Sequence, residues 1–402
     1  MRARQGLIWS VAVSALGYFV DLYDIVIFGV VRVASLSALG LSGQAVTDWG
    51  IRLLNLQMLG MLAGGIFWGV VGDRLGRRFT LLATISLYSL ANLANAAIGT
   101  VGQYALLRFI AGFGLAGELG AGVTLVAELL PAARRGYGTT VISFLGLVGA
   151  LTASFIGGWF DWRVAYLAGG LLGLVVLAGR WYGLRESELY AAQRGQRARQ
   201  GDLRLLFRSS ALLRFLAVVA AGVPIWYVSA LFVNLAPEIG KGLGLTVPLK
   251  VGEVLRWQAT GLAIGSACSG FAGEWLKSRK WVIAGCLAAM AALVVSLLHL
   301  RDGQAYAELM FAMGLFQGYW TVFLTMGAEQ FGTNIRATVS TSVPNFVRAM
   351  TVPVTLGLQA LAPALGVVDA SLLIGIAVFG LAALGLWSLR ETYGQALDFH
   401  EG

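Results

Sequence analysis

The sequence predicts an all-α integral membrane protein with twelve transmembrane helices, arranged as two six-helix parallel repeats. Hydrophobic residues make up 58% of the 402 residues and charged residues only 12%, more apolar surface than a soluble chain of this length could bury. Apolar runs long enough to cross a bilayer recur along the whole chain. These runs lie near 8–33, 53–72, 79–99, 104–130, 137–159, 164–184, 212–236, 254–273, 281–300, 306–328, 338–363 and 368–389.

The two halves of the chain are copies of one another at an offset of 201 residues. The segment GVVGDRLGRR at 69–78 returns as GFAGEWLKSR at 270–279. Single residues hold the same register in the pairs Gln57/Gln258, Gln103/Gln304, Gly117/Gly318, Glu128/Glu329 and Arg135/Arg336. A duplicated set of apolar spans is typical of transporters that carry their substrate between two repeats.

The positive charges predict the orientation. Of the 29 Lys and Arg, 20 lie at the N-terminus, in the loops that follow even-numbered spans, at the span ends beside these loops, or in the C-terminal tail. Because such residues stay in the cytoplasm, both termini should be cytoplasmic, in a bacterial inner membrane. The net charge of +9 then needs no nucleic-acid partner. We expect an N-terminal bundle over 1–184, a cytoplasmic linker over 185–211 and a C-terminal bundle over 212–402.

The sequence offers little for an enzyme or a cofactor. The two cysteines, Cys268 and Cys286, lie inside predicted spans, and the chain has only two histidines. We find no Ser-His-Asp set, no metal-ligand cluster and no nucleotide-binding loop. We therefore expect no cofactor or metal, and a receptor or membrane enzyme is a poor alternative.

The loop Gly69-x-x-x-Asp73-Arg74-x-Gly76-Arg77-Arg78 resembles the signature loop of the major facilitator superfamily. Three segments carry a narrower resemblance, to its metabolite:proton and aromatic-acid:proton symporters. They are GYFVDLYDIVIFG at 17–29, the Gly-Glu pair of span 4, and NFVR at 345–348. The resemblance implies a monomeric secondary active transporter that moves a small organic anion or zwitterion with protons by alternating access. A proton-antiporting exporter of drugs or metabolites is the alternative.

Three carboxyl groups are candidates for proton coupling, because ionisable residues deep in a bilayer are costly and usually serve a pathway. Asp21 and Asp24 are three residues apart and share one face of span 1. Two carboxylates this close do not both ionise cheaply, so one of them is expected to hold a proton. Glu118, in span 4, is either a further proton carrier or a permanent ionic partner.

Arg348 is the leading candidate for substrate binding. It lies near the middle of span 11 beside Asn345, and a guanidinium can bind a carboxylate through two parallel hydrogen bonds. The alternative is a structural salt bridge to a carboxylate such as Asp24. The resemblance also places Arg108 of span 4 at a central cavity. Weaker candidates for the pocket are Tyr23, Tyr227, Gln317 and Trp320.

A third set of charged residues lies at the predicted cytoplasmic ends of the spans. Its members recur in the two repeats, which favours a structural role as salt bridges that close an inner gate. The set comprises Asp73, Arg77, Arg78, Glu128, Arg135, Glu274, Glu329 and Arg336.

Overall fold

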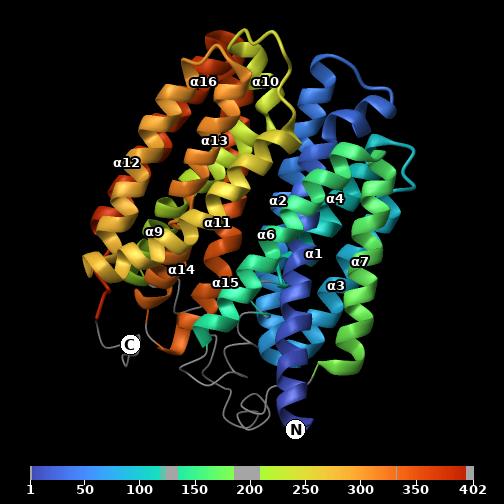
Figure 1. The fold of residues 1–402 in the computed structure, drawn as a ribbon, viewed down its shortest axis with the longest axis vertical. Helices are drawn as coiled ribbons and strands as arrows, with labels where there is room; N and C mark the ends of the chain where they lie inside the picture. Colours follow the sequence, from blue (N-terminus) through green and yellow to red (C-terminus); the bar gives the residue numbers. More distant parts are fainter. Residues whose placement is uncertain are drawn as a thin grey trace. The chain divides into compact units, whose positions relative to one another are not determined.

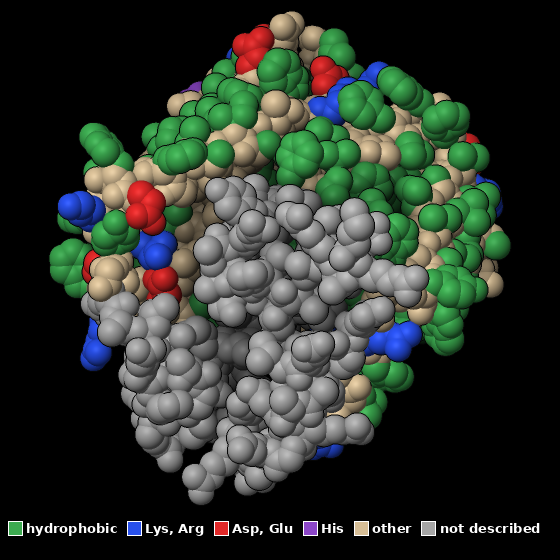
Figure 2. All heavy atoms as spheres, turned by 60° about the horizontal axis from the view of Figure 1, so that its bottom comes forward, with side chains coloured by type: hydrophobic (Ala, Val, Ile, Leu, Met, Phe, Trp, Pro, Cys, Tyr) green, Lys and Arg blue, Asp and Glu red, His purple; other side chains and the backbone are tan. Residues whose placement is uncertain are grey.

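The computed structural model describes residues 2–118, 120, 122, 135–184, 209–331 and 333–394, and every regular element in this part of the chain is a helix (Figure 1). Contacts between residues divide the chain into two compact units, residues 1–200 and 201–402. Large apolar side chains cover much of the described surface, as Figure 2 shows. Such a surface belongs in a bilayer, where helices satisfy their own backbone hydrogen bonds.

The first unit contains α1 (Arg2–Ala38), α2 (Gln44–Leu75), α3 (Arg77–Asn95), α4 (Val101–Leu115), α6 (Arg135–Trp159) and α7 (Trp162–Gly183). Local sequence sets several of these ends. Thr100 and Gln103 form a capping box at the start of α4, and Asp161 caps α7. Gly76 separates α2 from α3 with φ of 104°, a conformation that favours glycine.

The second unit contains α9 (Ser209–Val228), the π-helix η5 (Ser229–Asn234), α10 (Ala236–Gly242), α11 (Val251–Leu276), α12 (Arg279–Leu298), α13 (Gly303–Gln317), α14 (Trp320–Glu329), α15 (Thr333–Ala349) and α16 (Thr351–Ser388). The predicted span 306–328 is therefore broken between α13 and α14. The predicted spans 338–363 and 368–389 meet inside α16, where Gly366 leaves the helical conformation at φ 81°.

The two units use the same helix pairings. In the first, α1 packs against α6, α2 against α4 and α3 against α7; in the second, α9 packs against α15 and α16, α11 against α13 and α12 against α16. Gly60 and Gly64 on α2 lie directly against the backbone of α4, and their repeats Gly261 and Gly265 lie directly against α13. Small residues allow this close approach, so the sequence repeat is also a repeat of helix packing.

Six segments of the described chain are by themselves long and apolar enough to cross a membrane. They are Gln44–Gly72, Trp162–Gly183, Ala211–Asn234, Arg279–Leu298, Gly303–Glu329 and Ser342–Ser388. The last of these contains two of the predicted spans, joined at Gly366.

Candidate functional site

A buried ion pair joins α1 to α4 inside the first unit. Arg108 Nη2 donates to Asp24 Oδ1 at 3.1 Å, and both side chains are fully buried. The same guanidinium donates to Asn92 Oδ1 at 3.2 Å and to Gln57 Oε1 at 3.4 Å. Asp24 and Arg108 were predicted as separate functional residues, and the fold brings them together across 84 positions of sequence.

Arg108 has more interaction partners besides this ion pair than Asp24 has. The Arg108 guanidinium carbon lies 5.7 Å from the ring centre of Phe28 and 5.3 Å from that of Tyr166, within the range of a cation–π contact. Asp24 Oδ2 has no hydrogen-bond partner among the described residues. Asp24 could therefore accept a proton while Arg108 keeps its amide and aromatic contacts.

A second buried pair, between Glu118 and Arg180 of α7, has the opposite character. The two Nη atoms of Arg180 donate to the two carboxylate oxygens of Glu118. Arg180 Nε donates to the carbonyl of Val13, and Nη1 also donates to that of Leu81. The hydroxyl of Thr84 lies 3.4 Å from Glu118 Oε2. Each nitrogen of the Arg180 guanidinium thus donates a hydrogen bond, and these bonds connect α7 to α1, α3 and Glu118. This geometry is typical of a structural ion pair.

Asp21 is fully buried on α1, and its charge interacts with Arg180 and Tyr88. Asp21 and Asp24 therefore serve different neighbours, although they lie three residues apart. Asp24 belongs with Arg108, whereas Asp21 belongs to the environment of Arg180.

Arg348, in the second unit, is a buried arginine that differs from Arg108 and Arg180 in its lack of an ion-pair partner among the described residues. Its side chain is 2% exposed at the end of α15, and its guanidinium carbon lies 5.7 Å from the ring centre of Trp226 on α9. Among the described residues, no carboxylate forms an ion pair with it, and its Nε and Nη1 have no hydrogen-bond partner. Asn345 and Thr351 are buried on the same stretch of chain. Asp24, the carboxylate named in the structural alternative, pairs with Arg108 within the first unit.

The amide of Gln317 lies in a neutral cluster. Gln258 Nε2 donates to Gln317 Oε1 at 2.7 Å and to Ser229 Oγ at 3.1 Å, and Gln317 Nε2 donates to the carbonyl of Ile225 at 2.9 Å. Gln57 and Gln258 are repeats of one another, so one copy serves a charged cluster and the other a neutral one.

The aromatic candidates lie in helix packing. Tyr23 donates to the carbonyl of Ala165 and Tyr227 to that of Ser371, each at 2.8 Å or less, and both rings are fully buried. Trp320 is partly buried and stacks on Phe323 with ring centres 5.3 Å apart. The two tyrosine hydroxyls are therefore already engaged in holding helices together.

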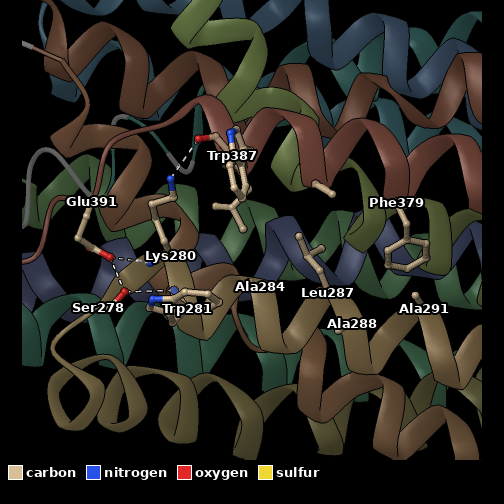
Figure 3. Close-up of a pocket in the computed structure, with 12 residues that line it drawn as sticks. Ser278, Lys280, Trp281, Ala284, Leu287, Ala288, Ala291, Phe379, Trp387 and Glu391 are labelled. Atoms are coloured by element: carbon tan, nitrogen blue, oxygen red, sulfur yellow. Dashed lines mark hydrogen bonds between the residues drawn. The ribbon is translucent and has the colours of Figure 1, made fainter.

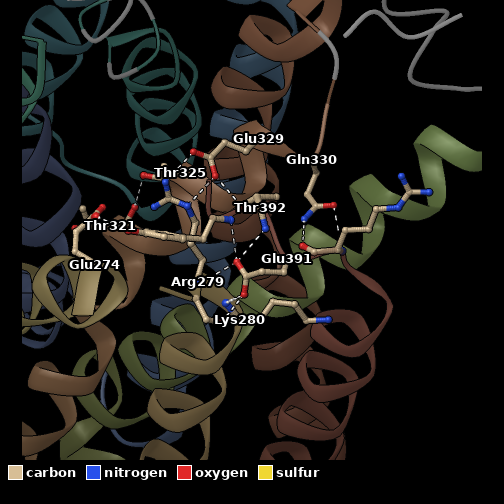
Figure 4. Close-up of polar contacts among 12 residues, drawn as sticks. Glu274, Arg279, Lys280, Thr321, Thr325, Glu329, Gln330, Glu391 and Thr392 are labelled. Atoms are coloured by element: carbon tan, nitrogen blue, oxygen red, sulfur yellow. Dashed lines mark hydrogen bonds and ion pairs between the residues drawn. The ribbon is translucent and has the colours of Figure 1, made fainter. Parts of the chain in front are cut away.

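Two gate candidates of the second unit, Glu329 and Glu274, make polar contacts near the start of α12 (Figure 4). Glu329 Oε2 lies 2.8 Å from Arg279 Nε and accepts from the hydroxyl of Thr392 at 2.7 Å. Glu274 accepts from the hydroxyl of Tyr393 at 3.0 Å. The segment that follows α16 is thus bound to residues of both repeated motifs in this unit.

Glu391 anchors the same segment. Its carboxylate accepts hydrogen bonds from the Ser278 hydroxyl and from the backbone N–H groups of Arg279, Lys280 and Tyr393. Partial burial alone would raise the pKa of Glu391, but these hydrogen bonds outweigh it and lower the pKa below its ordinary value.

The gate candidates of the first unit are only partly described. Arg77 donates to the carbonyl of Gly72 at 2.7 Å and Arg78 to that of Trp181 at 3.2 Å. Glu128 and the side chains of Asp73 and Arg135 lie outside the described residues, as do the side chain of Arg336 in the second unit and the predicted linker from residue 185 to residue 208.

Several residues of these clusters were not predicted. Arg180 was counted among the cations near a span end, although it lies four residues inside the predicted end of its span. Asn92, near the end of α3, is a polar residue in an apolar run and could have been noticed in the sequence. Nothing in the sequence of 389–394 indicated that Glu391, Thr392 and Tyr393 would bind the repeated motif.

Comparisons with known proteins agree with this architecture. The family model described as Major Facilitator Superfamily matches residues 14–346. The structure resembles that of a D-xylose-proton symporter with a TM-score of 0.73 and 20% identity, covering 97% of this chain and 100% of the symporter. The predicted all-α fold of twelve helices in two repeats is confirmed.

Relatives in sequence include the niacin transporter NiaP of Acinetobacter baylyi, with 37% identity over 33% of this chain and 32% of the relative. The gallate transporter of Pseudomonas putida is 32% identical over 45% of this chain and 40% of the relative. These two alignments thus span less than half of either relative. A protein of Haemophilus influenzae whose name assigns it to metabolite transport is 27% identical over 96% of both chains.

Proposed function

Because the chain belongs to the Major Facilitator Superfamily and is a multi-pass membrane transporter rather than an enzyme, we propose that it carries a small organic anion of the carboxylate class together with protons, by alternating access. The central observation is the buried cation of Arg348, which lacks an ion-pair partner among the described residues.

A buried guanidinium is costly unless an anion meets it. Trp226 offers a cation–π contact but no negative charge. A substrate carboxylate would neutralise Arg348 and could bind through two parallel N–H···O bonds. Asn345, one turn earlier on α15, is placed to orient the same carboxylate. The tryptophan face beside the guanidinium favours a substrate with an aromatic ring.

The names of the relatives support this substrate class. Gallate, niacin and 4-hydroxybenzoate, named for relatives of this chain, are all aromatic carboxylates. They share one ring and one negative group, the two features that Trp226 and Arg348 would bind. We therefore place a monocyclic aromatic carboxylate first among the substrates to be tested.

We assign proton coupling to Asp24. Its carboxylate forms an ion pair with one Arg108 nitrogen and keeps one oxygen without a hydrogen-bond partner among the described residues. Protonation would neutralise Asp24 and free the Arg108 contact, while Gln57, Asn92 and two aromatic rings still hold the guanidinium. Glu118 is assigned a structural role, because Arg180 engages both of its oxygens.

Alternating access requires the two six-helix bundles, 1–184 and 212–402, to rock about a substrate site. The charged residues of the repeated loops would then open and close on the cytoplasmic side, where we place both termini by the positive-inside rule. In this scheme Glu274 and Glu329 contribute to the inner gate through Tyr393 and Arg279.

A ligand screen tests the substrate class. The purified protein is heated with benzoate, 4-hydroxybenzoate, gallate and nicotinate, and with the neutral amides of benzoate and nicotinate. A true ligand stabilises the folded state by an amount that grows with the logarithm of its concentration relative to Kd. We expect at least one carboxylate to raise the melting temperature and its amide not to do so. Equal stabilisation by an acid and its amide would exclude the organic-anion proposal.

A further inference from the structure

A groove with a volume of about 730 Å³ opens between α12 and α16 in the second unit (Figure 3). Ser278, Lys280 and Glu391 lie at one end of the groove, and the rest of its lining is apolar. The apolar part includes Ala284, Ala288, Ala291, Ala383, Leu287 and Phe379. The volume is within the range of about 300–1,000 Å³ that is usual for small-molecule sites. None of these apolar residues belongs to the charged clusters described above.

The two repeats differ in sequence along this groove. Ala288 and Ala291 of α12 correspond, at the offset of 201 residues, to Leu87 and Leu90 of α3. The equivalent pair in the first unit, α3 and α7, is closely packed: a Cβ on Gly170 would lie 3.0 Å from the backbone nitrogen of Leu93. At these two positions the side chains of α12 are therefore smaller than those of α3.

Both walls of the groove are membrane-spanning segments, since α12 and the stretch that contains α16 are long and apolar enough to cross a bilayer. Two tryptophans at the mouth are strongly exposed, Trp281 at 75% and Trp387 at 86%. Exposed tryptophans on membrane helices mark the level of the lipid headgroups. The groove therefore runs from the headgroup region into the hydrocarbon region of one leaflet.

Lys280 supplies an uncompensated positive charge at this mouth. Its Nζ donates to the carbonyls of Trp387 and Leu389, at 3.2 Å and 2.5 Å, and an ammonium has three donors. No carboxylate among the described residues forms an ion pair with Lys280. Glu391 is close by, but its oxygens already accept from the Ser278 hydroxyl and from backbone N–H groups. Lys277 and Arg390, both exposed, add positive charge in the same stretches of chain.

We propose that this groove binds one anionic glycerophospholipid, with an acyl chain along the alanines of α12 and the phosphate at Lys280. The excess of basic residues places the site in the cytoplasmic leaflet. A lipid bound here lies against Ser278 and Glu391, which fix the segment after α16 to the Arg279–Glu329 pair. The lipid would therefore stabilise this polar cluster, independently of which substrate is carried.

Native mass spectrometry of the delipidated full-length protein, titrated with phosphatidylglycerol or phosphatidylcholine, tests the site. We expect one tightly bound phosphatidylglycerol. Lys280→Gln should weaken it about five-fold, the effect of one lysine at a membrane surface, with phosphatidylcholine unchanged. The double substitution Ala288→Leu/Ala291→Leu, which restores the side chains of the first repeat, should weaken both lipids.

Two control variants carry the same kinds of substitution outside the groove. Ala292→Leu alters an exposed alanine of α12 that does not line the groove, and Lys250→Gln removes an exposed lysine at the start of α11. Both should bind phosphatidylglycerol as the parent does. Unchanged binding in both Lys280→Gln and the double leucine variant would overturn the proposal. It would also be overturned if the delipidated protein were a dimer that the double leucine variant dissociates, since a second copy would then fill the groove.

Discussion

Asp24 Oδ1 accepts a hydrogen bond from Arg108 Nη2 at 3.1 Å between two fully buried side chains of the first unit. The two residues are held unequally. Arg108 has amide and aromatic partners besides Asp24, whereas the second oxygen of Asp24 has no hydrogen-bond partner among the described residues. This asymmetry makes the aspartate the group that can change its protonation state without disrupting the cluster.

Asp24→Asn is therefore expected to abolish accumulation of substrate driven by a proton gradient. Exchange of external for preloaded substrate should continue, because the amide fills the site but does not carry a proton. The measurement is uptake into proteoliposomes with and without a pH gradient, beside counterflow in the same vesicles. Asp48→Asn, which alters a carboxylate in an exposed hydrogen bond with Gln44, is the control. Gradient-driven accumulation by Asp24→Asn would move the coupling role to Asp21.

The Glu118–Arg180 ion pair should contribute to the stability of the protein and not to proton coupling. Glu118→Gln leaves the Arg180 charge buried, and breaking a buried pair costs about 3–5 kcal/mol. The variant should melt well below the parent in detergent, and Glu118→Gln/Arg180→Gln should regain part of the loss, because the charge of Arg180 that had lost Glu118 is then removed. The folded fraction of either variant should still accumulate substrate. Stable Glu118→Gln protein without proton coupling would contradict this role.

Arg348 should set the affinity for the substrate anion. Arg348→Lys keeps the charge but loses the paired hydrogen bonds, so it should weaken binding roughly ten-fold or more, and Arg348→Ala should weaken it further. The matched control is Arg52→Lys, since Arg52 also lies over a tryptophan ring, that of Trp49, but is exposed. Binding is measured by calorimetry with the carboxylate found in the screen. Parent-like affinity in Arg348→Lys would leave Arg348 with a packing role against Trp226.

Glu391 should make stability depend on pH. Its pKa is lower in the folded protein than the ordinary value of 4.5, so its stabilising effect is complete above pH 4.5. The effect is lost as the pH falls through the lower pKa of the folded state. The difference in melting temperature between the parent and Glu391→Gln should therefore be largest near neutral pH and shrink below pH 4.5. A difference that does not change with pH would show that the charge of Glu391 is not responsible.

The fold could be predicted from the sequence, because it depends on composition and repetition. The partners of the buried charged residues could not, because they depend on contacts between distant parts of the chain. The apolar runs and the offset of 201 residues were enough to predict the fold. Both can be recognised in the sequence without knowing which residues are in contact. Asp24, Glu118 and Arg108 were recognisable as costly charges in apolar spans. Their partners were not, since Asp24 and Arg108 are 84 residues apart and Glu118 and Arg180 are 62 apart.

The two tyrosines illustrate the same limit. Tyr23 and Tyr227 were predicted as pocket residues from their depth alone, yet each donates to a carbonyl more than 140 positions away. A buried hydroxyl needs a partner, and only the packing of α1 on α7 and of α9 on α16 decides which one it finds. Arg180 was overlooked for the converse reason, because a cation near a span end is usually explained by topology.

The proton-coupled anion transport proposed here is tested most directly by following protons rather than substrate. Proteoliposomes that contain a pH-sensitive dye and no imposed proton gradient are given an inward gradient of the carboxylate identified in the screen. Symport predicts that the lumen becomes more acidic as substrate enters, that the parent shows this signal, and that Asp24→Asn does not. A lumen that becomes alkaline would indicate antiport, and substrate entry without any proton movement would contradict proton coupling altogether.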